Sequence, residues 1–191
     1  LLGGEVVMDG VLLDGLQLAV VAPEAGKKTK ATDDDETAGA AGQGVKLDIG
    51  SVDIRNANIS YEDPSSGQKF VLTDFNFSGQ NVVSQQDFPA TMNFKLAILQ
   101  GGSQALSLQT TLEAQLFLDT VNNLFKASQL DLAVELQGEA FADKAVDLKL
   151  QGALSADLKA DRASLQGLSL SLAEMVLNAD IDVQQLSSKP K

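Results

Sequence analysis

The sequence contains no cysteine, no histidine and no tryptophan. Without cysteine the chain forms no disulfide and offers no thiolate to a metal, so cysteine usage leaves the redox compartment open. Without histidine and cysteine it also lacks the commonest general base and the usual ligands of zinc, copper and iron. A Ser-His-Asp or Cys-His catalytic arrangement cannot be assembled from these residues. We therefore expect a protein that is not an enzyme and that binds no cofactor and no metal.

Basic residues are scarce relative to acidic ones. The chain has 14 Lys and Arg residues against 26 Asp and Glu residues, which gives a formal net charge of −12. A chain with this charge is repelled by nucleic-acid phosphates and by anionic lipid headgroups. We therefore expect no nucleic-acid partner and no electrostatic docking on a membrane surface.

Long apolar runs are also absent. No run approaches the roughly 18 residues that a membrane-spanning helix needs. The chain starts with Leu1-Leu2-Gly3-Gly4 and no initiator methionine, so we expect a fragment of a longer protein, which leaves room for a membrane anchor or signal outside this sequence. The length of 191 residues and the 44% hydrophobic content suit one folded domain.

The composition divides the chain into three parts. Residues 1–22 are predicted to form N-terminal strands, in which Asp9-Gly10 and Asp14-Gly15 mark tight turns or bulges. Residues 23–44 contain no large apolar side chain and predict a flexible acidic loop. Residues 45–191 are predicted to be an antiparallel β-sheet region that forms a single elongated domain together with residues 1–22.

The dominant pattern after residue 44 is strict alternation of apolar and polar residues. It is clearest from Leu106 to Leu118 and from Leu130 to Leu136, and such alternation is typical of half-buried antiparallel strands. We predict a mainly β fold with few or no helices, a long antiparallel meander that forms a curled sheet or an open groove. The predicted turns fall at 63–68, 79–86, 100–104, 119–123, 138–144 and 159–162.

One segment, residues 110–127, has a helical alternative. It is rich in Leu, Gln, Asn and Ala, which favour helices on propensity. A wide helical stripe through Leu112 and Leu116 would leave Leu118 and Val121 outside it, so we predict a strand.

The polar positions of successive strands indicate that one face of the sheet is solvated throughout. Two packed sheets or one sheet curled over itself would both hide the apolar face. Close-packed sandwiches often contain a large core residue, such as the buried Trp of immunoglobulin-like domains, and this chain has none.

The hairpin at residues 52–77 departs from simple alternation. Its apolar residues change parity on both limbs at the same height, near Asn56-Ala57 and Asp74-Phe75. Since alternate residues of a strand point to opposite faces, we predict a twisted hairpin whose tip packs one way and whose base packs the other. In that case Ile54 and Ile59 would lie on different faces.

The same segment carries a resemblance to a known family. Residues 47–77, LDIGSVDIRNANISYEDPSSGQKFVLTDFNF, resemble the hallmark segment of the AsmA family, with its N-A-x-I-x-Y-x-D strand, turn and L-x-D-F strand. The upstream LDGLQL (13–18) and the later ASQLDLAVELQG (127–138) and ASLQGLSLSL (163–172) are similar to the family's other strands. The chain departs from the family by lacking the membrane anchor and the Asn-Trp pair that many members carry near the loop.

The resemblance implies a bacterial envelope protein. Its bulk would lie in the periplasm, tethered to the inner membrane by an N-terminal helix outside this chain. The family is related to bridge-like lipid-transfer proteins, whose stacked strands form a long groove with an apolar lining. Members are associated with phospholipid movement toward the outer membrane and with outer-membrane protein assembly. Phospholipid acyl chains and outer-membrane assembly factors are therefore the expected partners.

The candidate functional residues are those of the aliphatic face. Two interpretations stay open: the face is an ordinary β core, or it lines a groove in which each buried lipid methylene contributes roughly 0.8 kcal/mol. In the second case the lining residues would be Met92, Phe94, Leu96, Ile98, Leu106, Leu108, Leu130, Leu132, Val134, Leu136, Val146, Leu148 and Leu150.

Two acidic groups have simpler interpretations than catalysis or metal binding. The run at residues 33–36 lacks the alternation and glycine of an EF-hand loop, so a solvated charge run is expected. Glu62 and Asp63 stand beside Pro64, where an aspartate commonly starts a turn.

Overall fold

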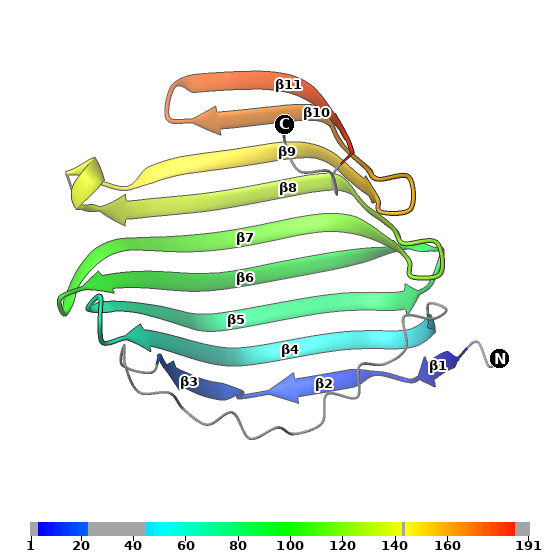
Figure 1. Ribbon diagram of the computed structural model, residues 1–191, viewed down its shortest axis with the longest axis horizontal. Coiled ribbons are helices and arrows are strands. Elements are labelled where there is room, and N and C mark those ends of the chain that lie inside the picture. Colours follow the sequence, from blue (N-terminus) through cyan, green and yellow to red (C-terminus); the bar gives the residue numbers. More distant parts are fainter. Residues whose placement is uncertain (1–3, 23–44, 143, 186–191) are drawn as a thin grey trace.

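The computed structural model describes residues 4–22, 45–142 and 144–185, and these form one curled β-sheet (Figure 1). The predicted loop at 23–44, with its acidic run, lies outside the described residues. The strands are β1 (Glu5–Met8), β2 (Val11–Asp14), β3 (Gln17–Val21), β4 (Lys46–Asp63), β5 (Gln68–Val83), β6 (Asp87–Gln100), β7 (Ser103–Asp119), β8 (Leu124–Gly138), β9 (Val146–Asp157), β10 (Arg162–Leu172) and β11 (Met175–Gln184), with a short 3₁₀ helix, η1, at Glu139–Phe141.

The strand order confirms the predicted curled antiparallel meander. From β4 to β11 each strand pairs with the next one in sequence, and every one of these pairs is antiparallel. Residues 110–127 form the end of β7, a turn and the start of β8, so the strand prediction for this segment is confirmed. No helix in the described ranges is long and apolar enough to cross a membrane.

The N-terminal edge of the sheet is parallel rather than antiparallel. Strands β1, β2 and β3 pair one after another along β4 in a single register, with Glu5 opposite Lys46, Val11 opposite Val52 and Gln17 opposite Asn58. The two Asp-Gly pairs therefore interrupt this edge without reversing the chain. At the first break a Cβ on Gly50 would lie 2.3 Å from the carbonyl oxygen of Asp9, so that position accepts no side chain.

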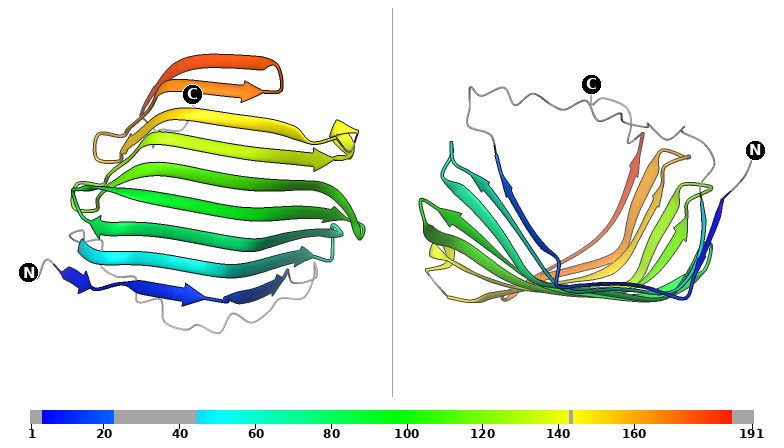
Figure 2. Two further views of the ribbon diagram at one scale, coloured as in Figure 1. Left: turned by 180° about the vertical axis from the view of Figure 1, so that it is seen from behind. Right: turned by 90° about the horizontal axis from the view of Figure 1, so that it is seen from below.

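The strands bend into a U, as the right-hand view of Figure 2 shows. On β5 a Cβ at Gly79 would lie 3.3 Å from a Val82 methyl and 3.5 Å from the Phe77 ring. Val82 also belongs to a buried cluster that packs against Val52, Phe77 and Leu116 from three strands of the same layer, as expected on the inner side of a bend. The apolar face is therefore the concave face of the sheet.

In the β4–β5 hairpin the apolar residues before and after the parity change lie on the same face of the sheet. Ile54 pairs with Phe77 and Ile59 pairs with Leu72. On the next strand these rows continue to Met92 and Leu96, which alternate regularly on β6. Since directly paired residues share a face, Ile54 and Ile59 lie on one continuous face, and the prediction of two faces is wrong.

A β-bulge is the physical reason for this result. The β4–β5 register shifts between Ile54 and Ala57 and again before Ile59. Asn56 and Asp74, at these shifts, have φ angles of 52° and 54°. Each bulge takes up one extra residue, so an odd spacing in the sequence restores the same face in the sheet.

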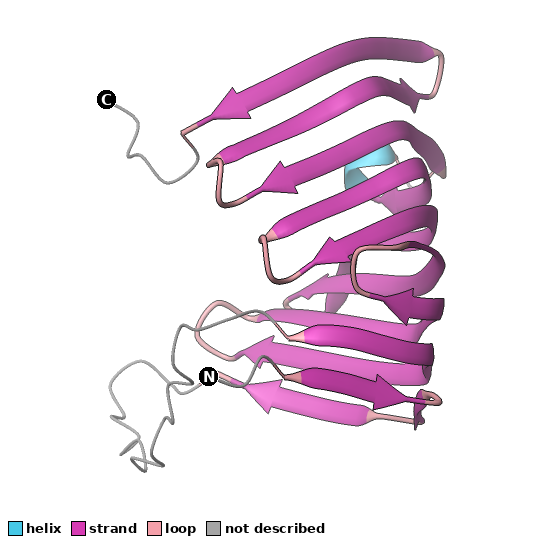
Figure 3. Cartoon of the chain, turned by 90° about the vertical axis from the view of Figure 1, so that its right-hand side faces the viewer, coloured by secondary structure: helices cyan, strands magenta, loops and turns pink. Residues whose placement is uncertain are grey.

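The enclosed core is small and lies at one corner of the sheet. Ile49, Val82, Phe88 and Ala90 form it, where the β5–β6 pairing has ended at Gly79 and Ala90. All the strands belong to one sheet, and Figure 3 shows them stacked in a single layer. The packed sandwich is thereby excluded in favour of the single curled sheet, and most apolar side chains remain only half-buried.

Candidate apolar groove

The strand registers bring apolar residues into rows that cross the concave face. The longest row runs through all eight strands from β4 to β11, and every member is apolar. Two further rows cross β4 to β9 and β6 to β11. The first row is Ile54, Phe77, Met92, Leu112, Leu132, Leu150, Leu170 and Leu177; the second is Ile59, Leu72, Leu96, Leu108, Leu136 and Val146; the third is Phe94, Thr110, Val134, Leu148, Leu172 and Met175.

Every predicted lining residue lies on this concave face. Met92, Leu132 and Leu150 belong to the first row, Leu96, Leu108, Leu136 and Val146 to the second, and Phe94, Val134 and Leu148 to the third. Ile98 and Leu106 pair with each other beside the second row, and Leu130 follows the bulge on β8 next to Leu132. The structure therefore gathers residues from four predicted strands on one continuous surface.

The prediction missed residues at both ends of this surface and one residue within it. Ile54 and Phe77 were hidden by the parity change at the bulges. Leu112 continues the alternation of Leu106 and Leu108, and that alternation was a sufficient signal to include it. Leu177 lies on β11, where the concave face reaches the edge of the sheet.

Side-chain exposure on β6 shows how the concave face differs from the other face. Thr91, Asn93 and Lys95 are exposed, whereas Met92 and Phe94 between them are half-buried. Phe94 also lies near Phe75, with ring centroids 6.3 Å apart. A half-buried apolar side chain on a single layer keeps one side open, so this surface can receive an apolar ligand.

Charged residues gather on the opposite, convex face. Cross-strand ion pairs join Lys69 to Glu62 at 3.3 Å and Lys95 to Asp74 at 2.9 Å. Arg162 pairs with Asp182, and the hydrogen bond from this guanidinium lowers the pKa of the Asp182 carboxyl. All these side chains are substantially exposed, so each pair contributes little to stability. Their importance is that they keep charge off the apolar surface.

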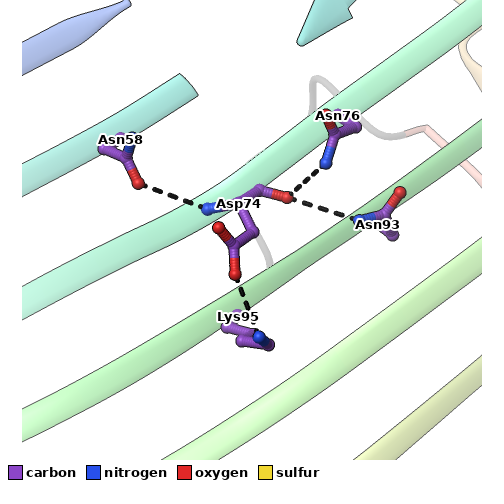
Figure 4. A network of polar contacts seen from close by, with 5 residues as sticks. All are labelled: Asn58, Asp74, Asn76, Asn93 and Lys95. Carbon is purple, nitrogen blue, oxygen red and sulfur yellow. Dashed lines mark hydrogen bonds and ion pairs between the residues drawn. The ribbon is translucent and has the colours of Figure 1, made fainter. Parts of the chain in front are cut away.

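A polar network on the convex face holds the bulge in place (Figure 4). The Asp74 backbone N–H donates to Asn58 Oδ1 at 3.3 Å, and the Asp74 carbonyl oxygen accepts from Asn76 Nδ2 at 2.7 Å and Asn93 Nδ2 at 3.3 Å. The Asp74 carboxylate accepts from Lys95 Nζ. These side chains replace the ladder hydrogen bonds that the bulge interrupts.

The turns at the ends of the strands are fixed by aspartates. Asp63 accepts hydrogen bonds from Ser65 N at 2.9 Å, Ser65 Oγ at 2.6 Å and Ser66 Oγ at 2.9 Å, and the two hydroxyls are the main cause of its lowered pKa. Asp119 accepts from Asn122 N and Nδ2 and from Gln85 Nε2. The Asp63 interactions agree with the turn interpretation of this residue.

The described residues contain no group of three or more acidic side chains that could hold a metal ion. What the arrangement offers is a continuous, uncharged, concave apolar surface with polar residues on its outer face. No protein-family model, no curated protein and no solved structure matches this chain. The resemblance of residues 47–77 to the AsmA family therefore stays a prediction.

Proposed function

We propose that this chain is a lipid-handling module whose concave face shields the acyl chains of phospholipids. The observation that supports it best is the apolar row from Ile54 to Leu177, which crosses eight strands without a polar side chain. On such a surface, apolar side chains can contact a lipid acyl chain across the whole width of the sheet. It also leaves the polar headgroup free to stay in solvent on the open side.

Burial of acyl methylenes supplies enough free energy for binding without a specific polar contact. At roughly 0.8 kcal/mol for each methylene, ten of them contribute about 8 kcal/mol. That corresponds to a dissociation constant of about 1 μM before the entropic cost of association is subtracted. Binding in that range is compatible with loading and release.

The resemblance supports a cellular setting for this activity. It implies a periplasmic groove module of an AsmA-like protein that is tethered to the inner membrane through a segment not in this chain. The groove would then serve phospholipid transport and lipid homeostasis of the outer membrane. This part of the proposal depends on residues 47–77 and their flanks.

A second candidate function is an interaction protein that assists outer-membrane protein assembly without conducting lipid. The observation in its favour is the exposure of large apolar residues on the two outermost strands of the sheet. Val7 on β1 is 67% exposed, and Met175 and Val176 on β11 are 66% and 64% exposed. Exposed strand edges can accept a further strand from a partner.

Native mass spectrometry of the purified chain, followed by lipid extraction, tests the first function. We expect phospholipid to co-purify with the wild-type chain. Leu132→Lys and Leu148→Lys place a charge on the apolar surface and should abolish retention. The matched controls Ala133→Lys and Asp131→Lys, on the convex face of β8 on either side of Leu132, should retain lipid. A wild-type chain that carries no lipid, or Leu132→Lys and Leu148→Lys variants that carry as much as wild type, would overturn the proposal in favour of the interaction protein.

A further inference from the structure

One hydroxyl interrupts the apolar rows at the centre of the sheet. Thr110 lies on β7 between Phe94 on β6 and Val134 on β8, directly opposite both. Its neighbours along the same face of β7 are Leu108 and Leu112. Thr110 is the only polar residue in the three rows described above, and it stands at their middle.

The Thr110 side chain is buried, but its hydroxyl has no partner among the described residues. Thr110 is 4% exposed, and neither a hydrogen bond nor an ion pair of its side chain occurs within residues 4–22, 45–142 and 144–185. The described residues also contain no side-chain oxygen that is both fully sealed and unpaired. The Thr110 hydroxyl is therefore accessible from the concave surface.

A hydroxyl in this place needs a physical reason. Once hydrocarbon covers this position, water is excluded, and leaving the hydroxyl without a hydrogen bond is unfavourable. Valine has the same shape and the same preference for strands, and it would pack between Phe94 and Val134 without that cost. A groove that held hydrocarbon alone would gain from valine here. The threonine thus points to a ligand with one weakly polar acceptor.

The surroundings narrow the chemistry of that acceptor. No charged side chain belongs to the rows around Thr110, so a phosphate or a carboxylate would lie there without a counter-charge. The ester carbonyl of a glycerolipid is uncharged, accepts hydrogen bonds and is attached directly to the acyl chain. The ester carbonyl also lies close to the headgroup. It can therefore reach Thr110 while the headgroup stays in solvent on the open side of the groove.

We propose that Thr110 Oγ1 donates a hydrogen bond to an acyl-ester carbonyl of a bound glycerolipid and so fixes the lipid along the groove. The inference deepens the proposed lipid-handling function and rests on it. It assigns the substrate class as ester-linked glycerolipids, in preference to ether-linked lipids with the same chains and headgroup. Acyl chains supply affinity along the rows, and Thr110 supplies position and selectivity.

Competition between two lipids tests this assignment in the full 191-residue chain. The wild-type chain is incubated with vesicles of diacyl and dialkyl phosphatidylcholine in equal amounts, with matched chain lengths, and the bound ratio is measured by native mass spectrometry. A single neutral hydrogen bond predicts about a three- to ten-fold preference for the ester lipid. Thr110→Val should bring the ratio of bound diacyl to bound dialkyl lipid close to one. The amount of dialkyl lipid bound should not fall. Thr110→Ser, which keeps a hydroxyl, should retain the preference.

The control is Thr111→Val, which removes a hydroxyl from the convex face one residue along the same strand. It should leave the ester preference unchanged. A wild-type chain that binds both lipids equally, or a Thr110→Val variant that keeps the preference, would overturn the role of Thr110 while leaving the groove intact. A wild-type chain that binds neither lipid would instead overturn the lipid-handling function itself. Thermal unfolding of Thr110→Val, expected at or above the wild-type temperature, shows that the variant is folded.

Discussion

Ile54 and Ile59 lie on the same face of the sheet although their spacing along β4 is odd. Their partners Phe77 and Leu72 continue to Met92 and Leu96 on β6, where the alternation is regular. The bulge at Asn56 makes this possible, because it takes up one residue of β4 without advancing the pleat, and the bulge at Asp74 does the same on β5. The bulged hairpin thus contributes its apolar residues to the same concave surface as the other strands.

The first prediction concerns the conformation of Asn56. Its φ of 52° is sterically unfavourable for most residues but is tolerated by asparagine and glycine. Asn56→Ala should lower the free energy of unfolding by about 1–2 kcal/mol, measured by urea denaturation. Asn56→Gly loses the same hydrogen bond to Asp14 but suits the conformation, so it should cost less.

Thr91→Ala, an exposed position in regular strand conformation, is the control for this pair and should be close to neutral. If Asn56→Gly destabilised the chain as much as Asn56→Ala, the backbone conformation would not be the source of the effect.

The strands and turns could be predicted from the sequence because each strand has a solvated face. On β6 the alternation from Met92 to Ile98 directly indicates which side chains share a surface. At the bulges that inference fails, since the residue count no longer matches the pleat. Asparagine and aspartate at positions 56 and 74 were a usable signal because they favour positive φ angles, whereas Gln129, with φ of 51°, gives no such signal.

The parallel edge and the unpartnered Thr110 hydroxyl could not be predicted. Strands β1 to β3 have the alternation of any strand, and only their pairing with β4 shows that they run parallel to it. Thr110 fits the alternation of β7 as a strand-forming residue, and its importance depends on Phe94 and Val134 from the neighbouring strands.

The second prediction concerns the close approach at Gly50. A Cβ there would lie 2.3 Å from the Asp9 carbonyl oxygen, which is backbone and cannot move aside alone. Gly50→Ala should detach the β1–β2 part of the edge from β4, and amide hydrogen exchange should show faster exchange in residues 5–14 than in wild type. Gly4→Ala is the matched control because a Cβ at Gly4 meets nothing within 4 Å. Unchanged protection in the Gly50→Ala variant would contradict this account of the edge.

The third prediction concerns acid stability and Asp119. Hydrogen bonds from Asn122 and Gln85 lower the pKa of the Asp119 carboxyl below its ordinary value. The ionised form therefore stabilises the fold above the unfolded-state pKa of about 3.9. That contribution is lost as the pH falls through the lower folded-state pKa.

Asp119→Asn should accordingly reduce stability near neutral pH and lose less stability than wild type when the pH is lowered from about 7 to about 3. Urea denaturation at both pH values measures the difference. Asp48→Asn makes the same charge change at an exposed residue of β4 and serves as the control. An equal loss in the wild type and in Asp119→Asn over this range would show that Asp119 does not contribute to acid stability.

The fourth prediction concerns the free edge at β11. Val176 is 64% exposed and pairs with Ser171 on the convex side of β10, so an apolar side chain stands on a strand whose outer edge pairs with no other described strand. Such edges associate with other strands. The net charge of −12 opposes association of two copies at low salt, and salt screens that repulsion. We expect the average mass from light scattering to rise with protein concentration, more steeply in about 0.5 M salt than in dilute buffer.

Val176→Lys should shift this mass toward the monomer, because a lysine on an edge strand disfavours pairing with another edge. Ser171→Lys introduces the same charge on the same face but one strand away from the edge, so its effect on the mass should be small. Equal effects of the two variants would attribute association to general charge rather than to the edge. A wild-type chain that stays monomeric at every concentration and salt would show that the bend and the charges of the sheet protect β11 from pairing with a second copy.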